Sequence, residues 1–270
     1  MATNTPFGQR LGLVLEGGAM RGIYTAGVLD VFLEAGIMPD VVVGVSAGAL
    51  HGCSYVAGQK GRSIRYYRKY RSDKHFMGLY SLLTTGDVVG TKFCYEDIPL
   101  RLDPFNEAAF EKAPVDFYVT VTNVRTGKPE YILCDELKVG SKMDVIRAGA
   151  SMPLCSKMVE WNGNLYLDGG VSDSIPYAKT KDFGCRKSIV VLTQPAGYLK
   201  QPAAMAPFEA MYRKYPAFVE AMRGRDQMYN TEVCAVEQAA KQGDVFFDSP
   251  QQVTACWPYG TRHRSSECTI

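Results

Sequence analysis

The sequence predicts an α/β fold built on a mostly parallel sheet, and three observations within the first 57 residues point to it. Residues 11–15 form a short apolar run that ends at a glycine-rich segment, and residues 23–35 stay apolar over the length of a helix. The run at 41–45 (Val-Val-Val-Gly-Val) is almost entirely β-branched, which is typical of a strand covered on both faces. A helix of small residues over 47–57 follows at once. Strand, helix, strand and helix in this order predict parallel strands.

Five further elements are expected between residues 116 and 195. They are a strand at 116–124, its hairpin partner at 129–134, a helix at 144–151, a hairpin at 159–167 and a strand at 188–193. Beyond Pro195 the composition shifts toward Met, Ala, Tyr and Gln. The elements expected there are helices over 208–222 and 230–242 and a strand at 245–247. We therefore divide the chain into a main domain, residues 10–195, and a small, mainly helical C-terminal extension with a loose tail, residues 196–270.

The composition excludes several classes of protein. The chain has 270 residues, of which 46% are hydrophobic and 21% charged, and its net charge of +2 is too small for a dedicated nucleic-acid binder. No apolar run reaches 18 residues, and the start lacks the apolar core of a signal peptide, so we expect a cytoplasmic protein without a membrane span. Eight cysteines form no Cys-x-x-Cys pair, and with three histidines they predict reduced thiols and no zinc site.

A Gly-x-Ser-x-Gly motif follows the second predicted strand, with Gly44, Ser46 and Gly48 between the valine run and the helix of small residues. Glycines at these positions permit a sharp turn that presents a serine hydroxyl at a helix N-terminus, where the helix dipole favours negative charge beside Oγ. The motif marks Ser46 as a candidate nucleophile. The alternative is a tight turn in which Ser46 only caps the helix.

The second motif, Gly17-Gly18-Ala19-Met20-Arg21-Gly22, lies between the first strand and the first helix. A glycine loop of this kind directs several backbone N–H groups toward one point, which makes an anion site. A dinucleotide-binding fold would place an acidic residue at the end of the second strand, where this chain has Ser46. Because neighbouring parallel strands end at one edge of a sheet, we expect the loop to face Ser46 as an oxyanion hole. The alternative is a loop that needs glycine only for its backbone conformation.

The third motif is Asp168-Gly169-Gly170, at the end of the second strand of a predicted hairpin. The carboxylate precedes two flexible residues and is therefore well placed to reach into a cleft. By itself an Asp-Gly-Gly sequence is more typical of a plain turn. Beside the other two motifs it makes Asp168 a candidate catalytic residue.

Together the three motifs resemble those of the patatin-like phospholipases, in particular the bacterial-type branch of that family. The resemblance covers residues 10–195 and implies a three-layer α/β fold with a mostly parallel central sheet. It implies a dyad of Ser46 as nucleophile and Asp168 as its partner. The loop residues would be the oxyanion donors Gly17, Gly18 and Ala19 and the supporting residues Arg21 and Gly22. Ala19 departs from the commonest family loop, which has a third glycine there.

The function that the resemblance implies is that of a serine acyl hydrolase acting on the ester bonds of phospholipids or lysophospholipids. Ser46 would attack the ester carbonyl, Asp168 would take its proton, and water would hydrolyse the acyl-enzyme. The family needs no metal or other cofactor. Transfer of the acyl group to another alcohol is compatible with the same residues. Two non-catalytic alternatives stay open, an anion- or nucleotide-binding module and a degenerate family member kept as a scaffold. No oligomeric state is predicted.

A Ser–His–Asp triad is the rival to the dyad, because Ser46, Asp168 and His263 occur in the chain order of an α/β-hydrolase triad. Only 45 residues precede Ser46, however, whereas the nucleophile of an α/β-hydrolase follows several strands. His263 stands between two arginines in a polar tail, and His51 is more than one helical turn from Ser46. The sequence therefore favours the dyad.

Residues 60–76 are rich in Arg, Lys and Tyr. This pattern favours an amphipathic helix whose tyrosines pack inward. The alternative is that its basic face contacts an anionic membrane surface, where each Lys or Arg contributes about 1 kcal/mol. The expected partners are thus a lipid or acyl ester substrate and, in the second case, a membrane; nucleic acid is not among them.

Overall fold

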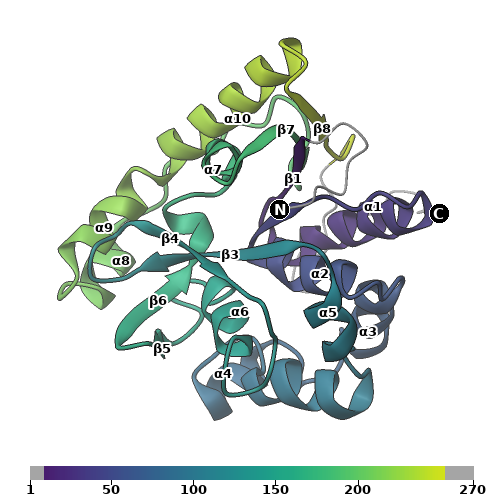
Figure 1. The fold of residues 1–270 in the computed structure, drawn as a ribbon. Coiled ribbons are helices and arrows are strands. Elements are labelled where there is room, and N and C mark those ends of the chain that lie inside the picture. Colours follow the sequence, from purple (N-terminus) through teal and green to yellow (C-terminus); the bar gives the residue numbers. More distant parts are fainter. Residues whose placement is uncertain (1–8, 253–270) are drawn as a thin grey trace.

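One mixed sheet runs through the computed structural model, which describes residues 9–252 (Figure 1). Its strand order is β5-β6-β3-β2-β1-β7-β8, with β4 also paired to β3. The parallel strands are β1 (Arg10–Leu15), β2 (Val41–Val45), β3 (Asp116–Asn123), β7 (Cys185–Val191) and β8 (Val245–Asp248). The antiparallel pairings involve β4 (Pro129–Leu133), β5 (Val159–Trp161) and β6 (Asn164–Asp168). The predicted α/β class with a mostly parallel central sheet is therefore confirmed.

Helices follow the strands along the chain. The α-helices are α1 (Gly22–Glu34), α2 (Ala47–Val56), α3 (Arg62–Tyr70), α4 (Leu79–Thr85), α5 (Glu107–Lys112), α6 (Met143–Gly149), α7 (Tyr177–Asp182), α8 (Ala206–Met211), α9 (Pro216–Arg223) and α10 (Arg225–Lys241). Two 3₁₀ turns, η1 (Ala19–Arg21) and η3 (Gly169–Val171), and a π-helix, η2 (Phe93–Leu102), complete the elements of the described chain. Gly36 follows α1 with a φ of 68°, the left-handed conformation of a C′ glycine.

The core has two layers because successive side chains of a strand point to opposite faces of the sheet. In β1, Leu13 and Leu15 are fully buried on the face covered by α2, and Val14 is fully buried on the face covered by α10. Figure 1 shows the two sets of helices on either side of the strands. Burying one such side chain contributes about 1.5–3 kcal/mol. Helices, sheet and helices make the three layers that the family resemblance implied.

Strand β3 pairs with three other strands, and this arrangement decides where the residues after β2 and at the end of β6 lie. Its residues Asp116–Thr120 pair with β2, Tyr118–Thr122 with β4 and Val121–Asn123 with β6. A strand has only two edges, and β4 shares residues of β3 with both β2 and β6. It follows that β2 and β6 lie one after the other along the same edge of β3.

The ends of β2 and β6 therefore meet. Val45, the last residue of β2, pairs with Thr120, and Asp168, the last residue of β6, pairs with the next residue, Val121. Strand β2 runs parallel to β3 and β6 runs antiparallel to it, so β2 and β6 approach the Thr120–Val121 position of β3 from opposite directions. The residue after Val45 is brought next to Asp168.

The predicted helix over 208–222 is wrong as a single element. The chain instead makes α8 and α9 with a turn between them. Pro216 has no N–H to continue a helix and disfavours the helical region for the preceding residue, Tyr215, whose backbone is not helical (φ −129°, ψ 68°). Pro216 then begins α9, a position that suits proline. After α10 the chain reverses over residues 242–244 and forms β8, which pairs with β7 at the edge of the main sheet.

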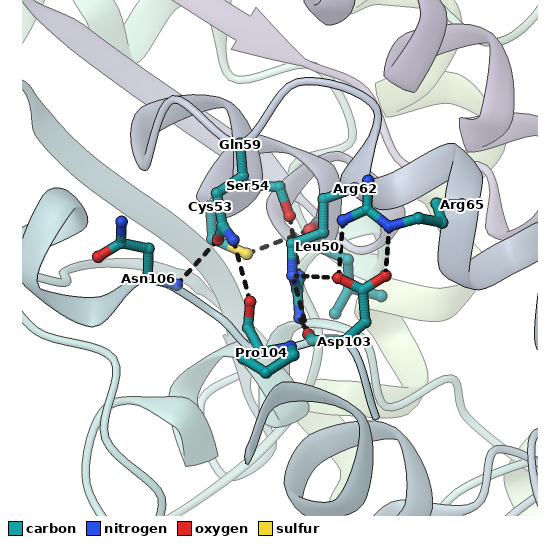
Figure 2. A network of polar contacts seen from close by, with 9 residues as sticks. All are labelled: Leu50, Cys53, Ser54, Gln59, Arg62, Arg65, Asp103, Pro104 and Asn106. Atoms are coloured by element: carbon teal, nitrogen blue, oxygen red, sulfur yellow. Dashed lines mark hydrogen bonds and ion pairs between the residues drawn. The ribbon is translucent and has the colours of Figure 1, made fainter. Parts of the chain in front are cut away.

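The basic stretch at 60–76 forms α3, with Tyr66, Tyr67 and Tyr70 buried, as the amphipathic interpretation expects. Two of its arginines, the buried Arg62 and the exposed Arg65, bind Asp103 (Figure 2). The side chain of Arg62 is 6% exposed, and it donates to the carbonyl oxygen of Asp103 (2.8 Å from Nη2) and to Ser54 Oγ (3.1 Å). Arg65 donates to both carboxylate oxygens of Asp103, at 2.7 and 2.8 Å. These contacts tie α3 to the end of η2.

We predict that Asp103→Ala lowers the free energy of unfolding by about 3–5 kcal/mol, because it leaves the buried Arg62 without its carboxylate. Urea denaturation at pH 7 measures the loss. The control is Asp97→Ala, since Asp97 pairs with the exposed Lys92 and Arg101 and such pairs contribute about 0–1 kcal/mol. Equal losses in the two variants would contradict the prediction.

Candidate active site

Ser46 lies at a sharp elbow between β2 and α2, with φ 52° and ψ −122°. A positive φ is strained for serine, at a cost of order 1–3 kcal/mol. The flanking glycines allow the turn through close approach. A Cβ on Gly44 would lie 2.5 Å from Cα of Ala49, and one on Gly48 would overlap the carbonyl oxygen of Leu15. The elbow predicted from the Gly-x-Ser-x-Gly motif is present.

The glycine loop between β1 and α1 lies directly against this elbow. A Cβ on Gly17 would come within 2.9 Å of Ser46 Cβ, and one on Gly22 within 2.7 Å of Ala47 Cβ. A Cβ on Gly18 would lie 2.5 Å from Thr193 Oγ1. Neither Gly17 nor Gly18 lies in the left-handed region (the φ of Gly18 is 177°), so these two positions require glycine for space rather than for a left-handed backbone.

The N–H groups of Gly17, Gly18 and Ala19 donate to no acceptor within residues 9–252. They are therefore available to a group bound beside Ser46. Ala19 is the residue under strain, with φ 47°. This region costs an L-residue about 1–2 kcal/mol, which gives a physical reason for glycine at this position of the family loop.

Glu16, which was not among the residues expected from the sequence, fixes the glycine loop through Thr193. Its side chain is almost fully buried and accepts hydrogen bonds from the Thr193 N–H (2.6 Å) and the Tyr229 hydroxyl (3.0 Å). Thr193 Oγ1 in turn donates to the carbonyl oxygen of Gly17 (2.8 Å). Burial raises the pKa of Glu16. The available signal was a carboxylate placed immediately after a buried strand and before two glycines.

Asp168 is 6% exposed and accepts a hydrogen bond from the N–H of Gly170 at 2.8 Å and another from Ser46. Burial raises the pKa of this carboxyl, and the two hydrogen bonds and the charges of Arg225 and Lys200 partly oppose the rise. Its own backbone is fixed, because the Asp168 N–H donates to the Ser151 carbonyl oxygen at 2.9 Å. The structure thus brings together the two residues that the sequence proposed as a dyad.

Two cavities meet at Ser46. The first is largely apolar and encloses ≈ 880 Å³ of space between its atoms; its lining includes Leu50, Tyr67, Phe76, Ile98 and Met143. The second is polar and contains Asp168, Glu16 and the cations Arg21, Lys200 and Arg225. Ala19, Ser46 and Met152 line both. A molecule with an apolar chain and a polar end, joined at a group beside Ser46, matches this pair of cavities.

Arg21 lies beside the glycine loop, and its backbone N–H donates to the carbonyl oxygen of Gly18 (3.0 Å). Lys200 and Arg225 were not anticipated. Arg225 Nε donates to the carbonyl oxygen of Gly170 (2.6 Å), inside the Asp-Gly-Gly segment. No local motif marks either residue.

The histidines do not complete a triad in the described chain. His51 is 1% exposed, packs its ring against Tyr67 with centroids 5.5 Å apart, and lines neither cavity at Ser46. Burial lowers its pKa to about 4, so its ring is neutral at pH 7. His263 lies outside the described residues. Within those residues no cluster of His, Cys, Asp and Glu is able to hold a metal ion.

A strained serine at a strand-to-helix elbow, with a glycine loop and a buried aspartate against it, defines an α/β protein of the nucleophile-elbow class. The family model described as Patatin-like phospholipase matches residues 13–180. The chain belongs to the patatin-like phospholipase family, which confirms the resemblance drawn from the three motifs.

Among curated proteins, the chain is 31% identical over 193 residues to the Uncharacterized protein YjjU of Escherichia coli K12. The aligned residues cover 69% of this chain and 53% of that protein. It is 30% identical over 190 residues to Lysophospholipase NTE1 of Saccharomyces cerevisiae, covering 68% of this chain and 11% of that protein. Lysophospholipase nte1 of Aspergillus terreus is 29% identical over 182 residues, covering 66% of this chain and 11% of that protein. The chain thus spans about half the length of one relative and about a tenth of the others.

Among solved structures, VipD of Legionella pneumophila matches 94% of this chain and 66% of its own, with 13% identity and a TM-score of 0.42.

We predict that Ala19→Gly raises the free energy of unfolding by about 1 kcal/mol, because glycine adopts the left-handed conformation without the Cβ penalty. Thermal or urea unfolding measures the gain. The matched control is Ala235→Gly at an exposed position inside α10, where the same exchange costs about 0.8–1.0 kcal/mol. A loss of stability in Ala19→Gly as large as in the control would show that the backbone of residue 19 is not strained.

Proposed function

We propose that the protein is a serine acyl hydrolase that cleaves an ester bond of a phospholipid or lysophospholipid through the Ser46–Asp168 dyad. The observation that carries the proposal is the hydrogen bond from Ser46 to the buried Asp168, at the junction of an apolar and a polar cavity. Family membership and the lysophospholipases among the relatives support a lipid ester as the substrate.

The first half of the reaction forms an acyl-enzyme. Ser46 Oγ attacks the ester carbonyl carbon while its proton passes to a carboxylate oxygen of Asp168, and the carbonyl oxygen becomes an oxyanion. The N–H groups of Gly17, Gly18 and Ala19, which donate to no acceptor within residues 9–252, would stabilise this oxyanion, and each such donor is worth about 2.7–4 kcal/mol in comparable sites. The C–O bond then breaks, the leaving alcohol takes the proton from Asp168, and the acyl group stays on Ser46.

The second half repeats these steps with water. Asp168 takes a proton from water, the hydroxide oxygen adds to the acyl carbon, and collapse of the oxyanion returns the proton to Ser46 Oγ with release of the fatty acid. The acyl chain occupies the apolar cavity throughout. Burial of Asp168 strengthens it as a base, because a carboxyl with a raised pKa holds the transferred proton more firmly than an exposed aspartate does.

We predict that Ser46→Ala and Asp168→Asn each lower kcat for a p-nitrophenyl acyl ester by at least about 10³-fold, because each removes one partner of the proton transfer. A fluorophosphonate probe is expected to label Ser46 alone, as mass mapping would show. His51→Leu, which preserves side-chain volume, and His263→Ala serve as controls and keep most of the activity. Full activity in Ser46→Ala would overturn Ser46 as the nucleophile, and a wild type without turnover would favour the non-catalytic alternatives. Loss in His263→Ala equal to that in Ser46→Ala would replace the dyad by a triad.

The pH dependence follows from the same assignment. Asp168 acts as a carboxylate, so kcat/KM should fall as pH falls through its pKa, which burial places above the ordinary value of 3.8. The acid limb should be unchanged in His51→Leu and His263→Ala, because neither imidazole takes the proton. A limb that disappears in either histidine variant would assign the base to that histidine.

We further propose that the enzyme works from the cytoplasm on the surface of a membrane. The six cysteines of the described chain are free thiols, and none of its helices is long and apolar enough to cross a bilayer. Helix α4 exposes Leu79 (62%) and Leu83 (77%). Four exposed basic residues precede it and form no ion pair within residues 9–252: Arg68, Lys69, Arg71 and Lys74.

This apolar and basic surface is continuous with the acyl cavity. Arg71, Lys74 and Leu79 line one hollow together with Phe76 and Met77. Phe76 and Met77 also line the apolar cavity that reaches Ser46. An acyl chain leaving a bilayer under α4 would therefore enter the cavity past Phe76 and Met77.

We predict that the double substitution Leu79→Gln/Leu83→Gln weakens binding to phosphatidylglycerol vesicles about 10-fold or more, since it removes two apolar side chains from the bilayer contact. Vesicle sedimentation measures binding, and turnover of a soluble short-chain ester should stay at the wild-type level. The control is Val31→Gln, because Val31 is 59% exposed on α1. Unchanged binding of the double variant would remove α4 from the membrane contact.

A further inference from the structure

The polar cavity beside Ser46 holds three cations: Arg21, Lys200 and Arg225. All three are only partly exposed, and no carboxylate of residues 9–252 forms an ion pair with any of them. This differs from Arg62 and Arg65, which share the carboxylate of Asp103. Half-buried cations without a counter-ion are costly and therefore mark a place where an anion binds.

The carboxylates that line the same cavity are already engaged. Glu16 accepts from the Thr193 N–H and the Tyr229 hydroxyl, and Asp168 accepts from Ser46 and the Gly170 N–H. The lining thus has two carboxylates against three cations. The cavity therefore presents positive charge in excess.

Each cation is held in position and keeps donors free. Arg225 uses Nε on the Gly170 carbonyl oxygen, which leaves its terminal nitrogens for the cavity. Nε of Arg21 is buried and has no acceptor within the described chain. Lys200 has its backbone fixed to Asn230 of α10 by two hydrogen bonds, at 2.8 and 3.1 Å, and its Nζ lies 4.3 Å from the ring centroid of Tyr229.

The pKa of Lys200 reflects the excess of positive charge in the polar cavity. Burial and the neighbouring charges of Arg225 and Arg21 lower its pKa to about 8, against the opposing effect of Glu16 and Glu232. A bound anion would reverse part of this shift by supplying the missing negative charge.

We propose that this cavity is the subsite for the leaving alcohol of the ester, and that Lys200 and Arg225 select a phosphate on that alcohol which carries no positively charged substituent. The proposal rests on the proposed function, because the apolar cavity must take the acyl chain for the alcohol to lie on the polar side of Ser46. Guanidinium and ammonium donors match phosphate oxygens, whereas a choline group would enter a cavity that already has excess positive charge. The preferred substrates are thus anionic lysophospholipids such as lysophosphatidylglycerol rather than zwitterionic ones.

Both selecting residues lie beyond residues 13–180, the part of the chain that matches the family. The catalytic motifs and the residues that choose the headgroup therefore come from different parts of the chain. Lys200 and Arg225 are specificity-determining residues in this scheme and take no part in proton transfer.

The test compares three soluble short-chain substrates with one acyl chain: lysophosphatidylglycerol, lysophosphatidylcholine and monoacylglycerol, each below its micelle concentration so that membrane binding plays no part. Wild type should have a kcat/KM at least 10-fold higher for the anionic lipid than for the zwitterionic one. Lys200→Met and Arg225→Gln should each lower the ratio of kcat/KM for lysophosphatidylglycerol to that for monoacylglycerol by about 10–100-fold, mainly through KM. Lys200→Arg, which restores the charge, should recover most of that ratio.

The control variant is Lys181→Met, because Lys181 also lies over a tyrosine ring, that of Tyr177, but outside this cavity. Its ratio should match wild type. sn-Glycerol 3-phosphate, as a soluble probe, should inhibit wild type competitively and inhibit Lys200→Met at least 10-fold more weakly.

The outcomes separate this inference from the proposed function. A wild-type protein that turns over none of the three substrates and does not react with a fluorophosphonate overturns the proposed function itself. A wild type that hydrolyses esters but prefers lysophosphatidylcholine, or an unchanged ratio in Lys200→Met and Arg225→Gln, overturns the anionic subsite and leaves the Ser46–Asp168 hydrolase standing.

Discussion

The site depends on one constraint of the sheet, the edge of β3 that β2 and β6 share. Thr120 and Val121 are consecutive residues of β3, and they pair with Val45 and Asp168, the last residues of two strands that approach from opposite directions. Because this register is set by backbone hydrogen bonds in the buried centre of the sheet, Ser46 and Asp168 meet without any flexible segment between them and the core. A slip of one residue in β6 would turn the Asp168 side chain to the other face of the sheet and abolish the contact.

Steric exclusion and strain refine what the sheet brings together. The glycine loop can lie against Ser46 because Gly17, Gly18 and Gly22 have no Cβ. Ser46 and Ala19 hold positive φ angles that cost free energy, and the surrounding structure compensates through buried contacts such as those of Glu16 with Thr193 and Tyr229. The strain and the unpaired N–H groups occur in the same few residues, which is expected where a fold prepares a site for a ligand.

Buried charge serves two opposite purposes in this chain. Arg62 and Arg65 are neutralised by Asp103 and hold α3 against the end of η2, so they contribute to the architecture around the apolar cavity. Lys200 and Arg225 are half-buried and form no ion pair with a carboxylate of residues 9–252, and they line the polar cavity next to Ser46. This contrast gives the two cavities their different chemistry. In the proposed subsite, residues 196–252 take part in headgroup recognition, and they also supply strand β8 at the edge of the sheet.

The sequence by itself determined the parallel α/β class, the elbow at Ser46 and the glycine loop, because each follows from residues adjacent in the chain: a valine run, a Gly-x-Ser-x-Gly turn and a cluster of glycines. It also contained the signal at Pro216 that divides α8 from α9, which the prediction of one helix overlooked. Only the tertiary structure decided how Asp168 reaches Ser46, since an antiparallel strand must take a particular register on β3. Only the tertiary structure placed Lys200 and Arg225 in the cavity, since their positions are set by how α10 and the segment before it pack across the sheet. Contacts between residues far apart in the chain leave no periodicity or motif in a single sequence, and they form only when the sheet and its helices close around them.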